Sequence, residues 1–113
     1  MRYILREYLY FLRRRKNLSQ NTIKAYQRDL EGYLAHLENY RDLADVTNIK
    51  TNDILAYLKT LRNHQLKPIT ISRKLSSIKG FHQFMFKEHI TKEDVSYHIQ
   101  TPKVDKNLPT VLT

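Results

Sequence analysis

Apolar residues recur at three- and four-residue intervals through most of this chain of 113 residues, and no other sequence feature constrains the fold as strongly. Such spacing places apolar side chains on one face of an α-helix. No segment shows the sustained alternation of apolar and polar residues that is typical of a half-buried strand. The chain contains only two Gly, and its three Pro lie at plausible element boundaries. We therefore expect an all-α fold, in which a single domain buries one core.

Capping residues set the expected helix boundaries. Ser19 and Thr91 offer hydroxyls that cap the free N–H groups of a first turn, and Thr51 or Asn52 does so for the third helix. Pro68 suits a first helical position, because no N–H is needed there. Residues 41–50 are expected to form a loop. The expected helices cover roughly residues 2–15, 19–40, 51–63, 68–85 and, as a short fifth helix, 92–98.

The apolar stripes of the four longer helices form the expected core. Gly80 in the middle of the fourth helix costs up to ~1 kcal/mol against Ala, so we expect it to permit close approach of a neighbouring helix. The expected core residues are Ile4, Leu5, Tyr8, Leu9, Phe11, Leu12, Ile23, Tyr26, Leu30, Tyr33, Leu34, Leu37, Ile54, Leu55, Tyr57, Leu58, Leu61, Ile71, Leu75, Ile78, Phe81 or His82, and Met85.

The net charge of +9 is concentrated in two blocks. Residues 1–28 and residues 50–87 each carry eight Lys and Arg against one acid, whereas residues 29–49 carry one Arg against five acids. Two basic blocks around an acidic spacer favour a face that binds a nucleic-acid backbone, and simple solubility is the alternative. The cations of residues 13–16 suit either a helix C-terminus or phosphate contact, and both interpretations stay open.

No complete active site, metal site or cofactor site can be assembled from the sequence. There is no Cys and no Gly-rich phosphate loop, and the five His are scattered without a ligand motif. Most of the eight Tyr lie on apolar stripes, where core packing is favoured over catalysis. No apolar run approaches the ~20 residues of a membrane span, and the N-terminus lacks a signal-peptide pattern. We therefore expect a cytoplasmic protein without a cofactor, a membrane partner or a small-molecule substrate.

Two of the expected helices carry a face of short hydroxyls and cations away from their apolar stripe. Short hydroxyls let a helix approach a duplex closely, and Arg binds phosphate or takes guanine through two hydrogen bonds. A solvated face is the alternative for either helix alone, but two such faces on one basic domain favour DNA binding. The candidate DNA-binding residues are Thr22, Lys24, Ala25 and Arg28 on the second helix and Thr70, Arg73, Lys74 and Ser77 on the fourth.

These segments carry a family resemblance. The motifs are Leu18-Ser19-x-Asn21-Thr22-x-x-Ala25-Tyr26-x-x-Asp29-Leu30, then Ile71-Ser72-Arg73-x-Leu75-Ser76-Ser77-Ile78-x-x-Phe81, and finally Thr101-Pro102-Lys103 with Leu108-Pro109-Thr110-Val111-Leu112-Thr113. In this order, over nearly the whole chain, they resemble the N-terminal core-binding (SAM-like) domain of the tyrosine recombinases, or phage-integrase family, most closely the Xer-type enzymes.

The resemblance implies a bundle of about four helices that forms one half of a C-shaped clamp on double-stranded DNA. It implies that the second and fourth helices lie across the major groove, and by position it assigns the family's DNA contacts to the same eight residues. It further implies contacts with other recombinase protomers on DNA, for which the first and fifth helices are candidates.

The chain departs from the family pattern in its length. The resemblance places the family's catalytic residues, including its nucleophilic Tyr, in a domain expected to begin just after Thr113, so no Tyr here is assigned that role. We expect residues 1–99 to form the DNA-binding domain and residues 100–113 a linker, in a fragment that is not itself an enzyme. The resemblance implies a parent protein that cuts and rejoins DNA through a phosphotyrosyl intermediate without a cofactor.

Two other functions fit the sequence. The third and fourth helices, joined through residues 64–68, would suit a stand-alone helix-turn-helix regulator, which predicts a stable dimer and a palindromic site. Alternatively, the basic faces would belong to a helical protein-interaction module, whose affinity for DNA is no better than that of an arbitrary protein of equal charge. A stand-alone enzyme is the least favoured, because no acid–base pair, nucleophile or metal set can be assembled.

Overall fold

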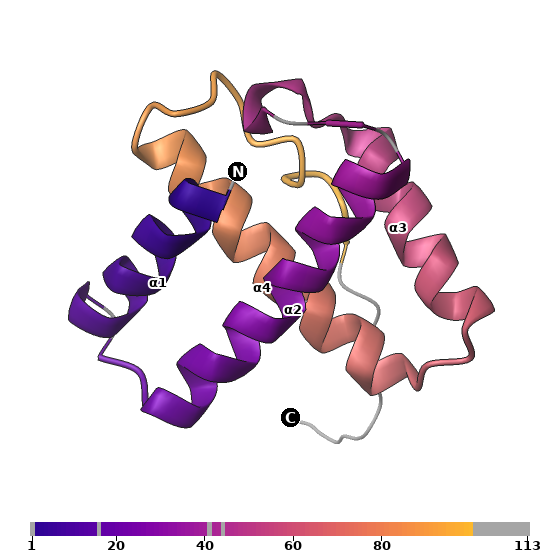
Figure 1. Cartoon of the computed structure of the whole chain (residues 1–113), viewed down its shortest axis with the longest axis horizontal. Coiled ribbons are helices and arrows are strands. Elements are labelled where there is room, and N and C mark those ends of the chain that lie inside the picture. Colours follow the sequence, from indigo (N-terminus) through magenta and orange to yellow (C-terminus); the bar gives the residue numbers. More distant parts are fainter. Residues whose placement is uncertain (1, 16, 41, 44, 101–113) are drawn as a thin grey trace, which may run out of the picture.

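The computed structural model describes residues 2–15, 17–40, 42–43 and 45–100. Within these ranges the chain contains four α-helices, α1 (Arg2–Arg15), α2 (Gln20–Tyr40), α3 (Thr51–Asn63) and α4 (Pro68–Lys87), together with the short 3-10 helix η1 (Val46–Asn48) and no strand. The predicted all-α class is therefore confirmed. Figure 1 shows that α2 and α4 cross in the middle of the molecule, with α1 and α3 on opposite sides of the crossing.

The starts of α2 and α4 follow the local chemistry of the sequence. The hydroxyl of Ser19 accepts a hydrogen bond from the backbone N–H of Thr22 at 3.2 Å, as expected of a capping residue. Pro68 is the first residue of α4, where its missing N–H leaves no hydrogen bond unmade. Both predicted starts are confirmed.

The connection between α2 and α3 differs from the prediction in two details. The expected loop contains η1, which Asp45 caps by accepting a backbone N–H at 3.0 Å. The cap of α3 was predicted at Thr51 or Asn52, which is wrong, because the helix already begins at Thr51 and Lys50 is the capping residue. The Lys50 backbone N–H donates to the carboxylate of Asp53 at 2.9 Å, so an acid in the first turn stabilises the start of α3.

The short fifth helix predicted over residues 92–98 is wrong. This segment forms successive turns, in which the N–H of Tyr97 donates to the carbonyl of Asp94 and the N–H of Ile99 to that of Ser96, each at 3.1 Å. The Asp94 carboxylate also accepts the Ser96 backbone N–H at 2.9 Å. A side chain that bonds its neighbouring backbone competes with helix formation, which explains the difference.

The core lies between α2 and α4 and is completed by α1 and α3. The predicted apolar stripes are confirmed in most positions. Leu55 is 46% exposed and lies outside the core, and four of the predicted residues are only partly buried and pack against it: Ile4, Leu9, Phe11 and Tyr26. Phe81 and His82 are both buried. The apolar residues with the least exposure belong to α2, α3 and α4: Leu30, Tyr33, Leu34, Leu37, Ile54, Leu75, Ile78, Phe81 and Met85.

The absence of a side chain at Gly80 lets α1 pack closely on α4. A Cβ atom at this position would clash with the phenol oxygen of Tyr8 on α1. Tyr8 has little freedom to move away, because it is 4% exposed and its ring centroid lies 5.2 Å from that of Phe84 and 5.7 Å from that of Phe81. The close helix approach predicted at Gly80 is confirmed.

A polar contact joins α2 to α4 inside the core. The hydroxyl of Tyr33 and Nε2 of His82 lie 2.8 Å apart, and both side chains are buried. Burial lowers the pKa of His82 to about 4, and burial raises the pKa of Tyr33 well above its ordinary value. The pair is therefore neutral at pH 7, which lets it stay in the apolar core at modest cost.

We predict that Gly80→Ala lowers the free energy of unfolding by about 1–3 kcal/mol, because the added methyl group overpacks the site against Tyr8. In a Tyr8→Phe background the clashing oxygen is gone, so the same change should be neutral or stabilising. Gly32→Ala is the matched control, since its nearest neighbour is the Tyr57 phenol oxygen at an ordinary 3.5 Å. Urea unfolding followed by circular dichroism measures these changes, and equal losses in the two Tyr8 backgrounds would contradict the explanation.

A second prediction concerns pH. Burial lowers the pKa of His82 in the folded chain to about 4 from its ordinary value of 6.5, so the unfolded chain binds more protons between these two pH values. The free energy of unfolding is therefore highest above pH 6.5 and falls as the pH decreases toward 4, by roughly 3 kcal/mol in all. Stability of His82→Gln should therefore vary less between pH 7 and pH 4.5 than that of the parent chain. Urea unfolding across this range tests the prediction, with the exposed His89→Gln as control, and identical pH profiles for the His82 variant and the parent would refute it.

Candidate nucleic-acid interface

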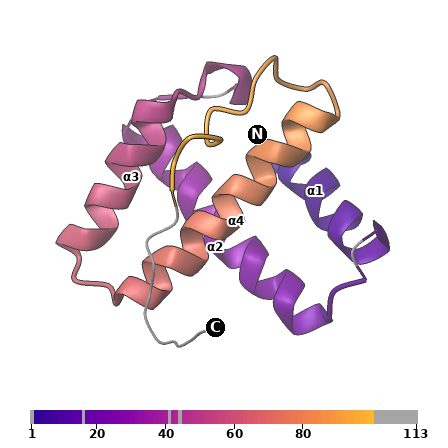
Figure 2. The same ribbon diagram turned by 180° about the vertical axis from the view of Figure 1, so that it is seen from behind.

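The eight candidate residues all lie in the first halves of α2 and α4, on either side of one edge of the molecule. Figures 1 and 2 view the crossing of these helices from opposite sides, and in both views their first halves diverge from the crossing toward the same edge. The two predicted faces are therefore brought together by the fold, although 42 or more residues separate their members along the chain. A single extended ligand lying along this edge would reach both helices.

The α2 part of this edge presents two exposed cations. Lys24 and Arg28 are exposed and lie four residues apart, so they share one side of the helix. Thr22 and Ala25 are partly buried between them and the core. The Thr22 hydroxyl lies 2.9 Å from that of Ser19, so it belongs to the structure of the helix start. The side chains of Thr22 and Ala25, which lie beside these cations, are short and leave room for close approach.

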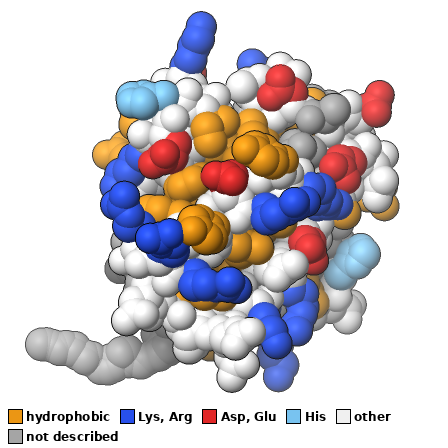
Figure 3. Space-filling view, turned by 60° about the vertical axis from the view of Figure 1, so that its left-hand side comes forward, with side chains coloured by type: hydrophobic (Ala, Val, Ile, Leu, Met, Phe, Trp, Pro, Cys, Tyr) orange, Lys and Arg blue, Asp and Glu red, His pale blue; other side chains and the backbone are white. Residues whose placement is uncertain are grey.

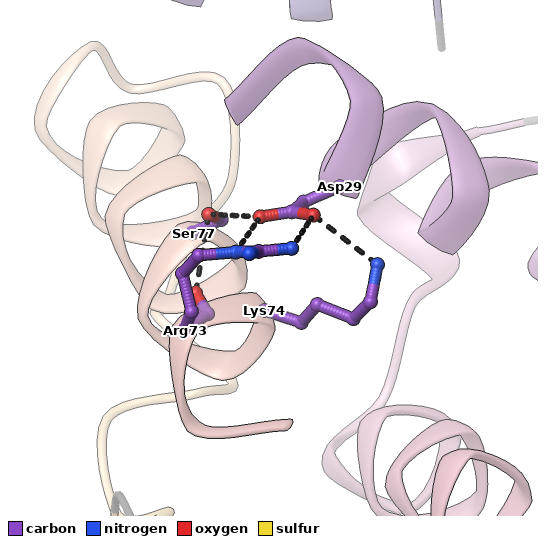
Figure 4. Close-up of polar contacts among 4 residues, drawn as sticks. All are labelled: Asp29, Arg73, Lys74 and Ser77. Carbon is purple, nitrogen blue, oxygen red and sulfur yellow. Dashed lines mark hydrogen bonds and ion pairs between the residues drawn. The ribbon is translucent and has the colours of Figure 1, made fainter. Parts of the chain in front are cut away.

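The α4 part of the edge is organised around Asp29, which sequence reasoning placed in a motif without giving it a role. Figure 4 shows Arg73, Lys74 and Ser77 of α4 converging on the Asp29 carboxylate of α2. Arg73 donates through Nε to Oδ2 at 3.2 Å and through Nη2 to Oδ1 at 3.1 Å. Nζ of Lys74 lies 3.1 Å from Oδ1, and the Ser77 hydroxyl lies 3.3 Å from Oδ2. We call these four residues the Asp29 cluster.

The side chains of the Asp29 cluster differ widely in their exposure to solvent. The side chain of Asp29 is 1% exposed, that of Lys74 is 18% exposed, and that of Arg73 is 52% exposed. Ser77 was predicted on the polar face, but it is 1% exposed and lies 3.3 Å from the carbonyl oxygen of Arg73 as well as from Asp29. Its predicted position on an exposed face is therefore wrong, since its hydroxyl is directed into the helix contact.

The electrostatics of the Asp29 cluster follow from this burial. A carboxylate removed from water is costly unless charged donors approach it closely, and here a guanidinium binds it through two hydrogen bonds while an ammonium approaches one oxygen. Two cations and one acid leave the Asp29 cluster with one excess positive charge. Arg73 is the more exposed of the two cations, so this charge is presented at the surface. The arrangement thus joins two helices and still presents a cation at the edge.

One sequence signal could have identified Asp29 as buried. It lies three residues after Tyr26 and four residues before Tyr33, which is the spacing of the apolar stripe of α2. An acid within such a stripe must find cations when the helix packs. The sequence does not say which helix supplies them, so the partners required the structure.

Other parts of the surface offer a weaker case for DNA. Figure 3 shows a neighbouring face on which Lys and Arg side chains alternate with acidic ones around exposed hydrophobic side chains. Mixed charge of this kind attracts a polyanion less than does an edge with an excess of exposed cations such as Lys24, Arg28 and Arg73. Among the described residues, no group of three or more His, Cys, Asp and Glu side chains could hold a metal ion. No helix in the described part of the chain is long and apolar enough to cross a membrane.

Comparison with known proteins points to one family. A family model described as "Phage integrase, N-terminal SAM-like domain" matches residues 5–89, a range that contains all eight candidate residues. The chain is 40% identical over 113 residues to the tyrosine recombinase XerD of Oceanobacillus iheyensis, covering 100% of this chain and 38% of that protein. It is 36% identical over 109 residues to the tyrosine recombinase XerD of Halalkalibacterium halodurans, covering 96% of this chain and 36% of that protein.

A relative with another name gives the same result. The chain is 39% identical over 100 residues to the tyrosine recombinase XerC of Roseiflexus castenholzii, covering 87% of this chain and 31% of that protein. The chain thus spans between 31% and 38% of the length of these relatives. No solved structure matched the chain.

The Asp29 cluster makes a prediction about stability. Asp29→Ala should lower the free energy of unfolding by about 2–4 kcal/mol, because it leaves Lys74 and Ser77 partly desolvated without their acceptor. Glu38→Ala serves as a control, since its ion pair with Arg2 joins side chains that are 38% and 44% exposed. A surface pair of this kind contributes only about 0–1 kcal/mol. Both values come from urea unfolding, and similar small losses in the two variants would show that the Asp29 cluster does not hold α2 and α4 together.

Proposed function

Because the chain belongs to the phage integrase family through its N-terminal SAM-like domain, we propose that it is the DNA-binding domain of a tyrosine site-specific recombinase. In this proposal the domain grips duplex DNA through the first halves of α2 and α4 during recombination. One observation carries it: the fold brings the two candidate faces to the same edge and leaves Lys24, Arg28 and Arg73 exposed there.

The residues at this edge divide into two roles. Lys24, Arg28 and Arg73 would bind phosphate oxygens, and an Arg at a groove would also take guanine through two hydrogen bonds. Thr22, Ala25 and Thr70 are partly buried, and their small side chains would let the helices approach the major groove closely. Lys74 and Ser77 would act on DNA only indirectly, since both are bonded to Asp29 and, unlike Arg73, are largely buried.

The proposal assigns DNA strand cleavage to no residue of this chain. Tyr8, Tyr33 and Tyr57 are buried, and burial raises the pKa of each phenol, which makes a poor nucleophile at neutral pH. The relatives are named tyrosine recombinases, and we infer that a larger protein of that kind performs the chemistry while this domain binds. Its partners would be double-stranded DNA and further recombinase protomers.

The proposal is tested by duplex binding in a salt series. Fluorescence anisotropy with a ~30-base-pair duplex should show an affinity whose logarithm falls linearly with the logarithm of salt concentration. Arg28→Ala and Arg73→Ala should each weaken binding at least about fivefold and lower the slope by roughly one unit. Arg6→Ala is the matched control, because it removes the same charge from an exposed position on α1.

The controls separate the proposed surface from general attraction. Equal losses in Arg6→Ala and Arg28→Ala would show that binding follows net charge and would remove the case for the α2 and α4 edge. The absence of binding at low salt would favour the protein-interaction module over the DNA-binding domain. A stable dimer with a palindromic site would instead favour the stand-alone regulator.

A further inference from the structure

We propose that Asp29 is a positioning residue for DNA binding, which holds the guanidinium of Arg73 so that its outer edge faces a phosphodiester of the duplex. The inference rests on the proposed function of the α2 and α4 edge and adds to it a residue that does not itself touch DNA. It concerns the Asp29 cluster defined above, in which one acid lies behind the exposed cation.

The geometry of the guanidinium leaves one edge available. An Arg guanidinium has five N–H donors in a rigid plane, and Asp29 engages it through Nε and Nη2. The adjacent edge, formed by Nη1 and the second N–H of Nη2, makes no hydrogen bond to the described residues. This edge has the spacing that binds two phosphate oxygens at once, or the O6 and N7 atoms of guanine. The 52% exposure of the Arg73 side chain leaves room for such a ligand.

The Asp29 carboxylate is itself held in place. It is 1% exposed, and Lys74 at 3.1 Å and Ser77 at 3.3 Å fix the oxygens that receive Arg73. Figure 4 shows the guanidinium lying alongside the carboxylate, with Ser77 at one end of the carboxylate and Lys74 at the other. Arg73 therefore enters binding with its side chain already ordered. Preorganisation of this kind reduces the entropy cost of ordering a long side chain on binding.

The charge of Asp29 makes this role testable by the sign of an effect. A negative charge close to a polyanion is unfavourable, so an account based on charge alone predicts that Asp29→Asn binds DNA more tightly. The positioning account predicts weaker binding. A carboxylate accepts a hydrogen bond at each of its two oxygens, whereas the Asn amide has only one oxygen and cannot accept from both Nε and Nη2 of Arg73. The two accounts cannot both be right for the same measurement.

The experiment measures duplex affinity by anisotropy for the parent chain, Asp29→Asn, Arg73→Ala and the double variant, with folding checked by circular dichroism. Asp29→Asn should weaken binding roughly twofold to tenfold. In the Arg73→Ala background the same change should have no further weakening effect, whereas a purely structural role would persist there. Glu31→Gln is the matched control, since it removes one exposed acid from α2 two positions away and should leave binding equal or tighter.

Each outcome bears on either this inference or the proposed function. If Arg28→Ala and Arg73→Ala weaken binding but a folded Asp29→Asn binds equally or more tightly, the positioning role is overturned and the DNA surface stands. If neither Arg variant matters, the proposed function fails. Should Asp29→Asn not fold, Arg73→Lys provides the test. This variant keeps the positive charge but lacks the planar N–H donors of the guanidinium, so full affinity for DNA would overturn the proposal.

Discussion

A buried carboxylate restricts how two helices can cross, and in this chain Asp29 imposes that restriction on α2 and α4. Its desolvation is offset only while Arg73, Lys74 and Ser77 stay within about 3.1–3.3 Å of its oxygens. A shift of α4 along α2 would break these contacts together. Since the crossing fixes where the first halves of both helices emerge, the separation of the two proposed DNA-binding faces follows from the same contact.

The remaining helices are arranged relative to α4. Beyond the Asp29 cluster, α4 holds α2 a second time through the neutral pair of His82 and Tyr33, so the crossing is fixed at two points by directional contacts. On its other flank α4 receives α1, whose Tyr8 fits over Gly80. Polar contacts thus determine the register of the helices, while apolar packing supplies most of the stabilisation. The cations at the edge therefore project from helices whose relative position is fixed by the packed core.

Most of the fold could be predicted from the sequence, because apolar residues at three- and four-residue intervals indicate both a helix and the face that it buries. The predictions failed where local hydrogen bonds determine the structure. Asp94 bonds the backbone of Ser96 in a segment of turns, and Asp53 accepts the backbone N–H of Lys50 at the start of α3. The site was harder. Helical spacing located its two faces, but Ser77 lies inside the helix contact, and the pairing of Asp29 with α4 depends on a neighbour that periodicity cannot identify. The DNA contacts themselves stay a prediction.

The most direct test of the α2 and α4 surface is a titration of the ¹⁵N-labelled chain with a ~30-base-pair duplex at low salt, followed by amide chemical shifts in two-dimensional NMR spectra. The account predicts that the largest shifts fall on the first halves of α2 and α4 and include the amides around Arg28 and Arg73. Shifts concentrated on α1 or α3, or spread evenly over all exposed cations, would contradict it.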